Sequence, residues 1–230
     1  MFSVFFWGGG EKINIIHYEK VLALFFAGIA LLFASGCEKR DDGLSKKVYE
    51  TEDSVKGWYV LSSVLPSSKN EACYNLNGDK TSSYDILSEL EIMPGFDKNS
   101  YRAYVGKVDP NFYSGHIQLH FPVQGVEYCE NGTPMGSTMF CELANTETDY
   151  IISHKGNNFI YTYPITDFIR GWKDAPFYVK ALSNGKVSFP KSDVLVFETD
   201  TEVYDFDKEC LLNVHLIYTF NRVTKEEHID

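Results

Sequence analysis

The chain lacks the short motifs that usually identify an enzyme. It has no HExxH, no GxSxG, no Walker A loop and no GxGxxG, so nothing indicates a zincin, an α/β-hydrolase, a P-loop NTPase or a dinucleotide-binding enzyme. No two cysteines form a CxxC pair, so the usual spacing of a structural zinc site is missing as well. We therefore expect no catalytic activity, no cofactor and no metal ion.

Basic residues are scarce. The chain has 21 Lys and Arg against 32 Asp and Glu, for a formal net charge of −11. Binding to nucleic acid depends on Lys and Arg that neutralise phosphates, so we exclude nucleic acid as a partner. A basic protein or a neutral glycan fits such a surface better, although negative charge also serves solubility alone.

Helical patterns are few, whereas strand patterns recur about every ten residues from Gly57 onward. Helical spacing is found over Ser83–Leu90, after a sequence that resembles a capping box, and Thr166–Trp172 has the pattern of one helical turn. Short runs rich in Tyr, Phe, Val and Ile, separated by turn residues such as Ser183-Asn184-Gly185, predict β-strands. The expected strands are Trp58–Leu65, Tyr101–Val108, His116–Phe121, Val126–Cys129, Thr138–Leu143, Tyr150–His154, Phe159–Tyr163, Phe177–Ala181, Val194–Glu198 and Leu211–Arg222.

Many short strands with little helix predict an all-β fold. We expect a mainly antiparallel sandwich or barrel with one or two short helices. Clean alternation of apolar and polar residues in Gly115–Phe121 and Leu211–Phe220 predicts that each strand buries one face.

One uncharged apolar run precedes the strand-rich region. Val21–Phe33 is followed by Ala34-Ser35-Gly36 and then by Cys37, which places small residues directly after an apolar stretch. This pattern resembles a bacterial lipoprotein signal peptide that ends in a lipobox. The resemblance implies that Cys37 carries acyl chains, becomes the first residue of the mature chain and anchors it in a lipid bilayer.

The alternative interpretation of this run is a transmembrane helix. Val21–Gly36 contains sixteen residues, whereas a span needs about 20, so the lipoprotein interpretation is favoured. It implies export and attachment to the bacterial cell envelope, in the outer membrane. It does not tell which leaflet holds the anchor, or whether the protein faces the periplasm or the cell surface. Met1–Lys20 is longer than an ordinary n-region, which also leaves the true start codon open.

These features divide the chain into three parts. Residues 1–36 are the expected signal peptide, 37–56 the lipidated cysteine and a charged flexible tether, and 57–230 a single β-rich exported domain. Eleven of the nineteen residues in Glu38–Lys56 are charged, and a segment with so little apolar surface does not order itself.

Four cysteines follow Cys37, and an even number in an exported chain predicts two disulfides. Four cysteines allow three connectivities; we favour Cys129–Cys141, because the turn residues between them would place both on paired strands. Cys73–Cys210 would then join the start of the domain to its last strand.

The sequence supports several hypotheses for function. We expect a non-catalytic binding module in the cell envelope, with the ligand unnamed. One narrower hypothesis is an immunity or inhibitor protein that neutralises a basic toxin or hydrolase, since an acidic surface steers basic partners. Another is surface carbohydrate binding, and an assembly role in the envelope is also open. A hydrolase using Asp205 and Asp207 is a weaker alternative. The candidate carbohydrate-binding residues are Phe112, Tyr113, Trp172 and Phe177.

Overall fold

The computed structural model describes residues 50–67, 72–109, 114–127, 139–152, 160–165, 177–178 and 183–223. All of them belong to one compact unit, Ser45–Asp230. Within these residues the chain is built mainly of antiparallel strands, which confirms the predicted all-β class.

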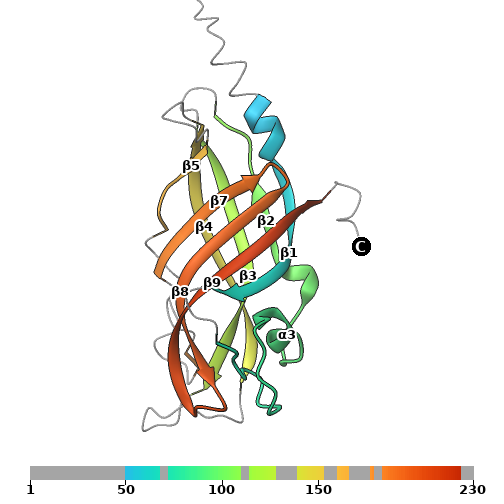
Figure 1. Ribbon diagram of the computed structural model, residues 1–230. Helices are drawn as coiled ribbons and strands as arrows, with labels where there is room; N and C mark the ends of the chain where they lie inside the picture. Colours follow the sequence, from blue (N-terminus) through green and yellow to red (C-terminus); the bar gives the residue numbers. More distant parts are fainter. Residues whose placement is uncertain are drawn as a thin grey trace, which may run out of the picture. The chain divides into compact units, whose positions relative to one another are not determined.

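Eight of the described strands follow one another around a nearly closed up-and-down barrel (Figure 1). Their order is β5-β4-β3-β2-β1-β9-β8-β7, and β6 (Phe177–Tyr178) pairs with β3 off this path. The main-chain N–H of Ile165 donates to Gly185 O at 3.0 Å and links the two ends of the order. The strands of the barrel are β1 (Gly57–Pro66), β2 (Arg102–Val105), β3 (Ser114–Glu127), β4 (Phe140–Ile152), β5 (Ile160–Thr162), β7 (Ser183–Lys191), β8 (Val194–Asp205) and β9 (Cys210–Val223).

The structure joins two pairs of predicted strands into single long ones. His116–Phe121 and Val126–Cys129 merge in β3, while Thr138–Leu143 and Tyr150–His154 merge in β4. Pro122, which lacks an N–H for the ladder, lies inside β3. However, the pairing of β3 with β2 ends at Leu119 and its pairing with β6 begins at Val126. Pro122 lies between them, so its missing donor disrupts no pairing on that side.

Strand β7 occupies a segment that the sequence marked as a turn. Asn184 does have the positive φ, 56°, that such a turn requires. It lies inside the strand, at the register shift between Ser183 and Lys186, so it forms a bulge in β7. The turn chemistry was therefore identified correctly, and in the structure it belongs to a bulge at the start of β7.

Two short helices accompany the barrel. The predicted helix at 83–90 is present as α3 (Ile86–Glu91), capped by Asp85, whose side chain accepts from the Leu87 N–H. A second helix covers residues 50–55, with Val55 buried. The prediction of a flexible tether through Lys56 was therefore wrong at its end, because Val55 contributes apolar surface that packs on the barrel. The 3₁₀ turn η2 spans Lys98–Ser100, and Thr166–Trp172 lies outside the described residues.

Aromatic side chains fill the interior of the barrel. Phe121, Phe197 and Tyr218 form a buried triangle, with ring centroids 5.0 to 5.7 Å apart. Tyr59 and Phe220 are also fully buried. An eight-stranded barrel is just wide enough to be filled by side chains or to hold one small ligand, and these aromatic side chains occupy part of the described interior.

Neither predicted disulfide is present. Cys141 is a free, buried thiol, and the β3–β4 register places Gln124 opposite it. The predicted partner Cys129 lies outside the described residues. Cys73 and Cys210 are free and exposed. Their pairing was inferred from the even number of cysteines, and that number says nothing about the distance between two of them.

Candidate functional site

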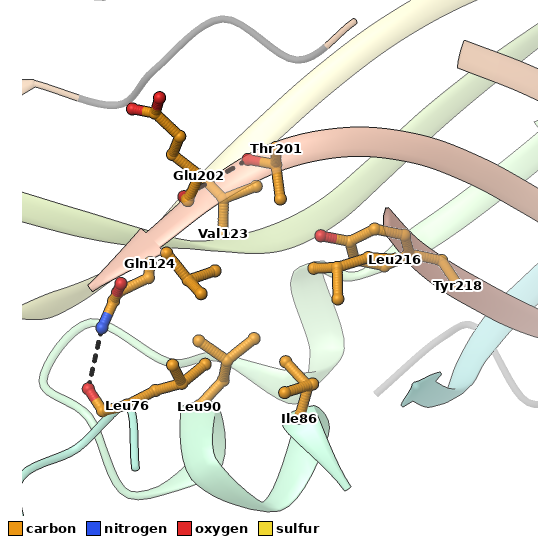
Figure 2. Close-up of a pocket in the computed structure, with 10 residues that line it drawn as sticks. Leu76, Ile86, Leu90, Val123, Gln124, Thr201, Glu202, Leu216 and Tyr218 are labelled. Carbon is orange, nitrogen blue, oxygen red and sulfur yellow. Dashed lines mark hydrogen bonds between the residues drawn. The ribbon is translucent and has the colours of Figure 1, made fainter. Parts of the chain in front are cut away.

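One end of the barrel is covered by the segment that contains α3, and a small cavity remains beneath it (Figure 2). Its volume is about 10 Å³, the room that one water molecule needs. Most of its lining is apolar, including Ile86, Leu90 and Leu216. Ordinary core contacts therefore explain this region better than a ligand pocket does.

Gln124 fastens the covering segment to the barrel. Its side-chain amide donates to Leu76 O at 2.9 Å and to Tyr204 O at 3.0 Å, while its oxygen accepts from Tyr204 N at 2.6 Å. Figure 2 shows the bond to Leu76. Because the amide is buried and its bonds are made within the protein, it has a structural role.

Asp205 and Asp207, the weaker hydrolase candidate, belong to the same structural network. Asp205 is buried and accepts from Lys208 Nζ at 2.7 Å and from Asp207 N at 2.9 Å. Asp207 accepts from Ser82 and Asn75, and these hydrogen bonds lower the pKa of its carboxyl. Asp205 therefore stabilises the β8–β9 turn internally, and Asp207 holds that turn against the covering segment.

The outer face of β1 to β4 carries a different arrangement, a row of side chains in cross-strand register. Trp58 lies opposite Tyr104, Tyr104 opposite Gln118, and Gln118 opposite Glu147. The Trp58 and Tyr104 rings pack with centroids 4.7 Å apart, yet Trp58 is still 39% exposed. Such a large aromatic side chain at the surface favours a contact site.

An acidic cluster continues this row. His116 lies opposite Asp149, with Nδ1 3.0 Å from Asp149 Oδ1 and Nε2 3.3 Å from Glu147 Oε2. Gln118 donates to Glu147 Oε1 at 3.2 Å. We call His116, Glu147 and Asp149 the His116 cluster. The aromatic–acidic face consists of this cluster together with Trp58, Tyr104 and Gln118. On four adjacent strands, the face combines two rings with an amide, an imidazole and two carboxylates.

A second cluster repeats this geometry on the opposite side of the barrel. His215 lies opposite Asp200, with Nδ1 2.6 Å from Asp200 Oδ1 and Nε2 3.6 Å from Glu198 Oε2. We call these three residues the His215 cluster. The strand order places two strands between the clusters on either route, β2 and β1 or β5 and β7. The two clusters therefore point in opposite directions.

The two clusters differ in how accessible their charges are. The side chains of Glu147 and Asp149 are 62% and 58% exposed, against 33% and 43% for Glu198 and Asp200. Asn184 donates to Asp200 Oδ2 at 2.6 Å, and this bond together with His215 lowers the pKa of the Asp200 carboxyl. The basic residue Lys186 also lies opposite Glu198 in register. The His215 cluster is thus more fully engaged within the protein.

The residues that sequence reasoning selected are not brought together by the described structure. Phe112, Tyr113 and Trp172 lie outside the described residues, as does Cys37. For Phe177 only the backbone pairing with Glu127 is described. The predicted carbohydrate site on the loops therefore stays a prediction.

Sequence reasoning missed the aromatic–acidic face. Trp58 and Tyr104 were assigned to strands, but which strands pair, and in which register, was not known. One signal was present: the tripeptide Glu-Thr-Asp occurs at 147–149 and again at 198–200. In both copies the threonine is buried, so both acidic residues point outward.

Comparison of the chain with protein-family models, with curated proteins and with solved structures gives no match. No group of three or more His, Cys, Asp or Glu side chains among the described residues is arranged to hold a metal ion. The described helices include none with the length and hydropathy of a membrane span.

Proposed function

We propose that this chain is a membrane-anchored lipoprotein of the bacterial cell envelope that acts as a non-catalytic binding module. The lipobox-like sequence ending at Cys37 supports the anchor. The observation that carries the binding role is the aromatic–acidic face, where an exposed tryptophan lies in register with hydrogen-bonding side chains. Because this face lies on the outer side of the strands, the proposed ligand binds on the outside of the barrel.

A neutral glycan is one candidate ligand class for the aromatic–acidic face. The Trp58 and Tyr104 rings offer apolar surface for the face of a sugar ring, and Gln118 and Glu147 lie beside them to hydrogen-bond hydroxyl groups. This strand site is distinct from the carbohydrate site predicted on the loops, which stays a prediction.

Site-specific photocrosslinking tests the binding role. A photoreactive phenylalanine analogue replaces Gln118 on the aromatic–acidic face or, as a control, Thr219 on the outer side of β9. The full chain is expressed in a bacterial envelope and irradiated. We expect an adduct from position 118 that position 219 does not give. Identical adducts at both positions, or none at position 118, would contradict a binding role for this face.

The anchor is tested separately. Metabolic labelling with a fatty acid should mark the parent chain and not the Cys37→Ala variant, and the variant should leave the membrane fraction. Equal labelling of the two chains would refute lipidation at Cys37.

A further inference from the structure

The aromatic–acidic face has the chemistry that recognises cationic side chains. Lys and Arg stack over the faces of Trp and Tyr rings, and a guanidinium also pairs with carboxylate oxygens through its fork of N–H donors. Trp58, Tyr104, Glu147 and Asp149 provide both kinds of partner on one surface. The chain as a whole carries a net charge of −11, which steers a basic partner toward it.

We propose that the aromatic–acidic face binds a basic, arginine- or lysine-bearing segment of a partner protein. This inference rests on the binding role proposed above for the same face, and it names the partner class. Charge complementarity favours a cationic protein segment over a neutral sugar, because sugar hydroxyl groups can hydrogen-bond the two exposed carboxylates at 147 and 149 but cannot neutralise their charge.

The distance between the aromatic rings and the carboxylates sets the expected distance between the basic residues of the partner. Trp58 and Glu147 are separated by three strand-to-strand steps, which is about 14 Å at roughly 4.8 Å per step. An extended chain covers about 3.3–3.6 Å per residue. One basic side chain over the rings and another at the carboxylates would therefore lie about four residues apart in an extended segment.

Positive charges near the face are engaged within the protein, among them Arg222, which donates to Ser54 O and Asp53 O. Arg102, opposite Val60 on β2, donates its Nε–H to Asn99 O, and Lys56 pairs with Asp53. His116 shares its two ring nitrogens between Asp149 and Glu147. Each of these carboxylates has two oxygens with two lone pairs each, so each can still accept from an incoming guanidinium.

The His215 cluster provides a control, since it has the same residue types in the same register and the described residues opposite it on β8 and β9 include no aromatic pair. The double variants Glu147→Gln/Asp149→Asn and Glu198→Gln/Asp200→Asn remove equal charge from opposite sides of the barrel. Binding of decaarginine to the full chain is measured by calorimetry at low and physiological salt. A decacitrulline peptide, which is uncharged, and a panel of neutral oligosaccharides serve as the other probes.

We expect decaarginine to bind the parent and decacitrulline not to bind. The first double variant should weaken binding about tenfold or more, the second less than about threefold, and Trp58→Ala about fivefold. Equal weakening by the two double variants would mean non-specific attraction and would overturn the proposal. Circular dichroism checks that each variant is folded.

The oligosaccharides separate this inference from the proposed function. If an oligosaccharide binds, loses affinity in Trp58→Ala, and decaarginine does not bind, the face is a binding site for glycans and the basic-partner proposal is wrong. If neither class of probe binds the parent chain, both the basic-partner proposal and the binding role assigned to this face are contradicted.

Discussion

Gly115 and Tyr150 lie directly opposite each other on β3 and β4, and the Tyr150 ring occupies the space that a side chain at position 115 would need. A Cβ at this position would lie 2.3 Å from Tyr150 Cε1. The ring is fixed there because the Tyr150 hydroxyl donates to Gly106 O at 2.7 Å. We expect Gly115→Ala to lower the free energy of unfolding by about 1–3 kcal/mol, measured by urea denaturation.

Gly106→Ala is the control for this prediction. A Cβ at position 106 would lie 3.3 Å from His116 O and 3.6 Å from the Tyr104 ring, a tighter contact than usual but without overlap. Gly106→Ala should therefore lower the free energy of unfolding clearly less than Gly115→Ala does. Equal costs for the two variants would show that the Tyr150 ring does not limit position 115.

Gln124 is expected to be the most important polar side chain at the covered end of the barrel. Gln124→Leu would leave Leu76 O, Tyr204 O and Tyr204 N without their side-chain partner. Buried groups that lose a partner cost about 1–3 kcal/mol each, so we expect a loss of roughly 2–4 kcal/mol in urea denaturation. The same substitution at the exposed Gln118, Gln118→Leu, should lower the free energy of unfolding by less than about 0.5 kcal/mol. A Gln124→Leu chain as stable as the parent would rule out this fastening role.

The sequence predicted the strands better than their partners. Alternation in Gly115–Phe121 correctly predicted that Ile117, Leu119 and Phe121 are buried. The bulge at Asn184 and the passage of β3 through Pro122 were missed, because local signals for a break do not show whether a neighbouring strand is present. The aromatic–acidic face depends on the register of four strands, and this register is fixed by long-range packing that no single segment encodes.

Glu89 on α3 should make stability depend on pH. Burial raises the pKa of its carboxyl above the ordinary 4.5, despite hydrogen bonds from the Leu76 and Asn77 N–H groups. Because the folded chain favours the protonated form, the contribution of Glu89 is fully present below pH 4.5 and is lost as pH rises through the raised pKa. The Glu89→Gln variant should not lose stability in this way as the pH rises.

The measurement is the free energy of unfolding of both chains between about pH 4 and 7. The variant should gain stability relative to the parent as the pH rises. A difference that does not change with pH, or that changes in the opposite direction, would contradict the raised pKa of Glu89.

The three described cysteines should differ in reactivity. Burial raises the pKa of the Cys141 thiol to about 11, and Tyr101 Oη lies 3.1 Å from its sulfur. Cys73 and Cys210 are free and exposed. Without reductant, iodoacetamide should label Cys73 and Cys210 in the native chain and Cys141 only after unfolding, as mapped by mass spectrometry. Protection of both Cys73 and Cys210 that reductant removes would instead indicate that they form a disulfide.

Nuclear magnetic resonance titration of the ¹⁵N-labelled full chain with decaarginine tests the central claim most directly. The indole resonance of Trp58 is assigned with Trp58→Phe, and amide resonances report on the strands. The account predicts that shifts concentrate at Trp58, Gln118 and Glu147 while Asp200 and His215 stay unchanged. Shifts centred on the His215 cluster, or spread evenly over the acidic surface, would contradict a binding site on the aromatic–acidic face.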